Sequence, residues 1–112
     1  MAFTGYNPLV VALDCTAAGS PTTATSVRPL KIVDASAYVT TAAGQATSAQ
    51  VSSSTGAVTD DFSLGNNNAN KMGRAGQIDD AHQAVASGTA ISAAWTGAGT
   101  AGRVSVILID NS

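Results

Sequence analysis

Two aspartates and the only histidine of the chain stand close together in the segment Asp79-Asp80-Ala81-His82. Carboxylate and imidazole groups are ligands for zinc and similar metals. Four neighbouring residues supply too few ligands by themselves, and neither helical nor strand spacing directs all three side chains to one face. We therefore expect a solvated turn here and no metal site.

A second acidic pair, Asp60-Asp61, would have to join the first to form the paired carboxylates of a glycosidase or a calcium site. Nothing in the sequence places the two pairs near each other. A serine-histidine-aspartate triad can be written with His82 and many serines, but no nucleophile elbow accompanies any of them. We predict that the protein is not an enzyme and has no catalytic residues, metal or cofactor.

The glycines of residues 97–102, Gly97-Ala98-Gly99-Thr100-Ala101-Gly102, match the G-x-G-x-x-G pattern of dinucleotide-binding loops. That site requires a helix directly after the glycines, because the pyrophosphate lies at the helix N-terminus. Here the glycines precede the apolar, strand-like segment Arg103 to Asp110. We expect them to connect two strands of a hairpin.

Trp95 and Tyr38 have aromatic faces that suit the CH groups of a sugar ring. In a chain with few bulky side chains they are expected instead to pack in the core or at a subunit interface. The lone Cys15 has no partner for an internal disulfide, and we expect a small buried thiol.

The composition limits the class of protein. A chain of 112 residues fits one domain. Charged residues make up 11% of it, against about 25% in typical globular domains, and there is no glutamate. A free monomer with so little charge tends to associate, which indicates a protein that works as part of an assembly.

The distribution of basic and apolar residues argues against binding to nucleic acid and against insertion into a membrane. The five basic residues are scattered and the net charge is -2, so no basic patch for nucleic acid is expected. The apolar runs Leu9 to Leu13 and Val104 to Ile109 are far shorter than the roughly 18 residues of a membrane span. The first residues lack the pattern of a secretory signal, so we predict a soluble protein made in the cytoplasm.

Short apolar and β-branched segments alternate with turn residues along the chain, as in antiparallel β-proteins. We expect an apolar strand at Asn7 to Asp14 that is covered on both faces, and a loop or extended connector at Thr16 to Val27. Further strands are predicted at 28–33, 37–41, 46–53, 88–95 and 103–110, with a turn at Asp34-Ala35-Ser36 and a surface loop at 65–70. Residues 57–64 fit either a short strand or a helical turn, and 78–87 fit either a weak helix or a strand.

These elements predict an all-β fold, an antiparallel β-sandwich of jelly-roll type with one short helix as an option. Residues 1–27 would form an N-terminal strand and extended arm or connector, and residues 28–112 the sandwich domain.

Most of the chain after residue 30, together with the segment Tyr6 to Val11, resembles small structural proteins of tailed bacteriophages. The resemblance is carried by four segments: Lys31 to Val39, Gly73 to Ala81, Ala86 to Ile91 and the final strand. Similar chains rich in Ala, Thr and Gly occur among capsid decoration (cement) proteins and head-fibre proteins.

The resemblance implies a virion protein, made in the cytoplasm of a bacterial host, that binds the major capsid protein on the capsid exterior and stabilises the shell. It also implies a homo-oligomer, with a trimer favoured, and no catalytic residues. The alternative is a head-fibre or receptor- or glycan-binding module that uses Trp95, Tyr38 and the loop 66–70. The candidate contacts with capsid or sister subunits are apolar and aromatic side chains: Phe3, Tyr6, Leu9, Val11 and Trp95.

Overall fold

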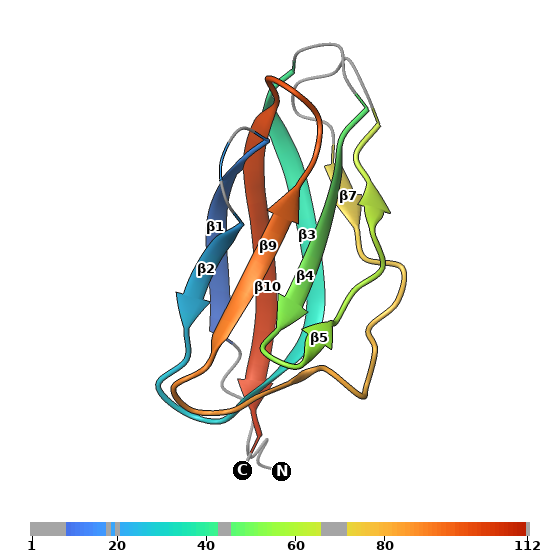
Figure 1. Cartoon of the computed structure of the whole chain (residues 1–112). Coiled ribbons are helices and arrows are strands. Elements are labelled where there is room, and N and C mark those ends of the chain that lie inside the picture. The colour runs from blue at the N-terminus through green and yellow to red at the C-terminus, as the bar shows by residue number, and fades with distance from the viewer. Residues whose placement is uncertain (1–8, 18, 20, 43–45, 66–71, 112) are drawn as a thin grey trace, which may run out of the picture.

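Two antiparallel β-sheets packed face to face form the protein in the computed structural model, which describes residues 9–17, 19, 21–42, 46–65 and 72–111 (Figure 1). In the first sheet, sheet A, the strand order is β1 (Leu9–Thr16), β10 (Ala101–Asp110), β3 (Leu30–Thr41) and β7 (Met72–Arg74), and β8 (Ala84–Val85) also pairs with β3. In sheet B the order is β2 (Thr22–Thr25), β9 (Ala90–Trp95), β4 (Ser48–Ser53) and β5 (Gly56–Ala57), and β6 (Phe62–Ser63) also pairs with β4. The all-β, two-sheet prediction is therefore confirmed, and the jelly-roll connectivity stays a prediction.

The core lies between the sheets and follows the two-residue period of the strands. In β10, Val104, Val106 and Leu108 are buried, whereas the residues between them are half-buried on the outer face of sheet A. The predicted strand at 46–53 is present as β4. The period of two in this strand indicates that Ala49 and Val51 share one face, and both are fully buried. Small and β-branched side chains thus fill the space between the sheets.

The predicted turn at Asp34-Ala35-Ser36 is wrong, because β3 runs without interruption from Leu30 to Thr41. Opposite β10, Asp34 pairs with Ile107 and Ile32 pairs with Leu108, so Val33 is the extra residue of a β-bulge. The Asp34 carboxylate accepts the Ala35 amide at 2.8 Å and forms an ion pair with Arg74 of β7 at 2.6 Å. These tertiary partners let a turn-forming residue remain inside a strand.

The predicted hairpin between the last two strands is also wrong. Both strands exist, but β9 lies in sheet B and β10 in sheet A, so residues 96–100 cross from one sheet to the other. Each strand is already flanked by two other strands of its own sheet. Gly97 and Gly99 have positive φ angles of 107° and 76°, which glycine adopts most easily and which the tight crossover requires.

The segment 78–87 forms turns and the two-residue strand β8, and the described part of the chain contains no helix. Apart from one turn bond, from the His82 amide to the Asp79 carbonyl at 3.1 Å, its backbone groups bond to distant parts of the chain: the Asp79 amide donates to the Val58 carbonyl at 2.6 Å, and the Ile32 amide donates to the Gln83 carbonyl at 2.9 Å. The helix option for this segment is therefore wrong, because long-range partners replace those of a helix.

Two strands arise from the N-terminal part of the chain. The predicted first strand is present as β1, which pairs with β10 along all eight of its residues. The predicted connector after it contains β2, which pairs with β9. Residues 9–25 thus contribute a strand to each sheet. Residues 1–8 of the predicted N-terminal arm and residues 66–70 of the predicted surface loop lie outside the described residues. The division of the chain at residue 27 stays a prediction.

Candidate interaction surface at the open edge

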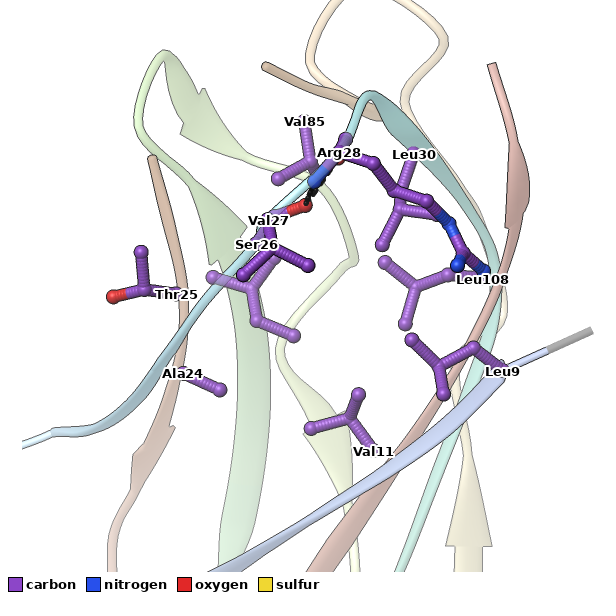
Figure 2. A pocket seen from close by; sticks show the side chains of 11 residues that line it. Leu9, Val11, Ala24, Thr25, Ser26, Val27, Arg28, Leu30, Val85 and Leu108 are labelled. Atoms are coloured by element: carbon purple, nitrogen blue, oxygen red, sulfur yellow. Dashed lines mark hydrogen bonds between the residues drawn. The ribbon is translucent and has the colours of Figure 1, made fainter. Parts of the chain in front are cut away.

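The end strands β1 and β2 lie on the same side of the sandwich, one in each sheet (Figure 1). The gap between the two sheets at this side, here called the open edge, contains a groove of about 110 Å³. Figure 2 shows Leu9, Val11 and Leu108 pointing into the groove from sheet A and Ala24 from β2. The other lining residues are Thr25, Ser26, Val27, Arg28, Leu30, Val85 and Ile91. The groove is therefore lined mainly by aliphatic side chains.

Exposed apolar side chains surround this groove. Of the five exposed large hydrophobic residues in the described part of the chain, Leu9 (38% exposed) and Val27 (88%) line the groove, and Val10 (61%) lies beside Leu9 on the outer face of β1. One charged group lies at the rim, and it is paired, since the Arg28 guanidinium is 2.8 Å from the Asp110 carboxylate. Exposed apolar side chains next to an apolar groove are typical of an interaction site.

Within the described residues, hydrogen bonds cover the free edge of β1 only at its C-terminal end. The Thr22 hydroxyl donates to the Asp14 carbonyl at 2.7 Å, and the Gly19 amide donates to the Thr16 carbonyl at 3.2 Å. Alternate residues of an antiparallel strand direct their backbone groups to the same side. Val10 and Ala12 therefore present their amide and carbonyl groups to the same free edge as Asp14.

The structure brings together only some of the candidate contact residues. Leu9 and Val11 line the groove, whereas Phe3 and Tyr6 lie outside the described residues. Trp95 is only 8% exposed, and its indole nitrogen donates to the Thr100 hydroxyl at 2.9 Å. Its side chain is thus part of the core and offers little surface to a partner or a sugar ring.

One aspartate of each acidic pair, Asp60 and Asp79, bonds to nearby backbone amides. The Asp60 carboxylate accepts the amides of Gly76 and Gln77 at 2.9 and 3.3 Å, and the Asp79 carboxylate accepts the Ala81 amide at 2.9 Å. The His82 imidazole is 3.0 Å from the Thr55 hydroxyl. Over the described ranges, no three His, Cys, Asp or Glu side chains lie close enough to hold a metal ion.

Reasoning from the sequence missed the contribution of β2 and the turn after it to this surface. Ala24 and Val27 stand in a segment rich in Ser and Thr, and no period marks them as parts of an apolar surface. The only signal is that Val27 is a large aliphatic residue in an otherwise small and polar stretch. Its 88% exposure is apparent only from the fold.

No family model, curated protein or solved structure matches this chain. Among the residues that the structure describes, no helix has the length and hydrophobicity needed to cross a membrane.

Proposed function

We propose that the protein is a capsid decoration protein: it binds the major capsid protein on the outer surface of a phage capsid and stabilises the shell. The open edge supports this proposal, because it combines an aliphatic groove with the exposed Leu9, Val10 and Val27. The resemblance of the sequence to phage structural proteins supplies the identity of the partner.

The physical basis of attachment is burial of apolar surface. Covering such surface contributes roughly 25 cal/mol per Å² removed from water. The low charge of the chain, 11% of residues, reduces the desolvation cost that charged groups would add at an interface. Many copies on one shell then add their separate contacts, so modest affinity per copy is sufficient to reinforce the capsid.

Attachment is tested by adding the purified protein to capsids that lack it and measuring co-sedimentation and resistance of the capsid to heat. Saturable binding and a higher disruption temperature are expected. Absence of saturable binding would exclude the decoration role.

Point variants locate the contact better than truncation, because removal of residues 1–27 would delete one strand from each sheet. Val27→Asp places a charge on an 88% exposed side chain and leaves the core intact. We expect it to weaken capsid binding at least about tenfold, a loss of roughly 1.4 kcal/mol. Ala94→Asp adds the same charge to the exposed outer face of β9 and should bind like the unmodified protein. Equal binding by both variants would remove the open edge from the capsid contact.

A further inference from the structure

The stretch Leu9 to Leu13 of β1 is an edge without the usual protection against pairing. Natural edge strands carry lysine, proline or a bulge, or are very short. This stretch is Leu-Val-Val-Ala-Leu, and its pairing with β10 contains no bulge. It therefore offers a straight, apolar template for another strand.

The other edges of the two sheets differ from β1 in length. On the far side of sheet A, β7 has three residues and β8 has two. In sheet B, β2 has four residues and β5 and β6 have two each. Among the described strands, β1 with eight residues is the one edge long enough for an extended ladder.

Apolar side chains on both faces of β1 remain partly exposed in the single chain. Val10, on the outer face, is 61% exposed, and Leu9, on the inner face, is 38% exposed. A strand paired at the edge of β1 would place its own side chains beside those of β1 on both faces of the sheet. In the single chain, part of this apolar surface faces water.

We infer that β1 pairs antiparallel with β1 of a second copy of this chain, around a two-fold axis that passes beside Val11. In this register Leu9 faces Leu13 of the second copy and Val10 faces its Ala12. This inference rests on the proposed function for the role of the open edge in assembly. It goes further by naming the partner that pairs with β1.

The geometry of an antiparallel pair restricts the register. Residues directly opposite each other lie on the same face, so outward Val10 can oppose outward Ala12 but not inward Val11. Asp14 and Thr16 already use their edge carbonyls for contacts within the chain. Centring the pair on Val11 leaves those contacts in place and lets Val10 and Ala12 exchange backbone hydrogen bonds with the second copy.

Charge also favours a second copy as the occupant. The one charged side chain of β1 is Asp14, which is bound to Arg103 at 2.8 Å. In the register centred on Val11, Asp14 does not face Asp14 of the second copy, so like charges are not opposed. The residues from 9 to 13 oppose only aliphatic partners, and this segment is therefore complementary to itself.

A two-fold pair of this kind is closed, because each β1 edge is used once. The free protein is then a dimer in which two sheets A form one continuous sheet. The trimer implied by the resemblance would need another surface, so the mass of the free protein separates the two arrangements.

The test uses charge at the paired positions. In Val10→Lys/Ala12→Lys, lysine opposes lysine twice across the pair, and the substituted side chains are exposed, so the fold is retained. By analytical ultracentrifugation we expect the unmodified protein to be dimeric and this variant to dimerise at least about tenfold more weakly. The control Thr40→Lys/Ala94→Lys has the same charge on exposed positions away from the edge and should remain dimeric.

A second variant with glutamate at the same two positions tests whether these positions oppose each other in the pair. Val10→Glu/Ala12→Glu should also be monomeric, and an equimolar mixture of the lysine and glutamate variants should restore dimers that contain one of each. A monomeric unmodified protein, a dimeric lysine variant or a mixture without mixed dimers would each overturn the pairing.

The register is checked with cysteines in a Cys15→Ala background. A mixture of Val10→Cys and Ala12→Cys chains should form mixed disulfides, because opposed Cα atoms in such a pair are about 5.5 Å apart, within disulfide range. Each chain alone should cross-link far less, and equal cross-linking of the single variants would contradict this register.

The experiments distinguish failure of the self-pairing of β1 from failure of the capsid decoration role. If the protein dimerises but does not bind capsids, the pairing stands and the decoration role fails. If it binds capsids as a monomer and the lysine variant loses that binding, β1 pairs with the capsid protein and the inference of self-pairing fails.

Discussion

The indole nitrogen of Trp95, at the end of β9, lies 2.9 Å from the hydroxyl oxygen of Thr100, directly before β10. Because the two strands belong to different sheets, this hydrogen bond closes the crossover between them. The Thr100 hydroxyl in turn donates to the Gly97 carbonyl at 2.6 Å. A buried polar relay thus fixes the path of the glycine-rich segment.

Thr100→Val should destabilise the fold by about 1–3 kcal/mol, because it leaves the buried indole N–H of Trp95 without its acceptor. Urea unfolding followed by tryptophan fluorescence measures the loss. Thr100→Ser keeps the hydroxyl and should lie close to the unmodified protein. Equal stability of the Val and Ser variants would show that the hydrogen bond contributes little.

Gly102→Ala should be destabilising by about 1–3 kcal/mol or more, since overpacking forces the backbone to shift. A methyl group there would lie 2.1 Å from the Tyr38 carbonyl oxygen and 2.5 Å from the Trp95 ring. Thermal unfolding of the two proteins checks this. At Gly19 the nearest atom to an added methyl is a threonine hydroxyl at 3.1 Å, so Gly19→Ala serves as the milder control, and a comparable loss there would contradict the packing explanation.

Removal of the Asp34–Arg74 ion pair by Arg74→Gln should leave the midpoint of urea unfolding nearly unchanged. The pair is short, at 2.6 Å, but the Arg74 side chain is 74% exposed and solvent screens the interaction. Urea unfolding at low and high salt gives the measurement. A loss that is large and independent of salt would indicate that the pair holds β7 against β3.

Burial of the Cys15 thiol raises its pKa above the ordinary value of 9.0, with a smaller opposite effect from Thr22. The folded state therefore holds the proton more tightly than the unfolded state, and stability that is present below pH 9.0 is lost as the pH rises through the folded pKa. Unfolding measured from pH 7 to 11 should show a steeper decline for the unmodified protein than for Cys15→Ala. Parallel curves would contradict this assignment.

The fold class was predictable because the strand signal is local. Both β4 and β10 were predicted from their residue types, and alternation in β4 also indicated that Ala49 and Val51 share one face. Leu9 and Val11 of the candidate contact residues line the groove, and their contact with a partner stays a prediction.

Two predictions were wrong because contacts with residues distant in the sequence outweigh the local conformational preference of the segment. Asp34 is a turn former, yet it stays within β3 because Arg74 and the bulge at Val33 accommodate it. Residues 78–87 have a weak helical pattern, yet their backbone bonds to other strands.

The sequence by itself determined most of the longer strands and the low charge, because these depend on side-chain type and two-residue spacing. Only the tertiary structure decided that β9 and β10 lie in different sheets and that Trp95 is buried between them. It also decided that β1 and β2 end their sheets on the same side, with Val27 beside the groove. Strand order depends on which non-local edges meet, and that choice is made by packing of the whole chain, not by any single segment.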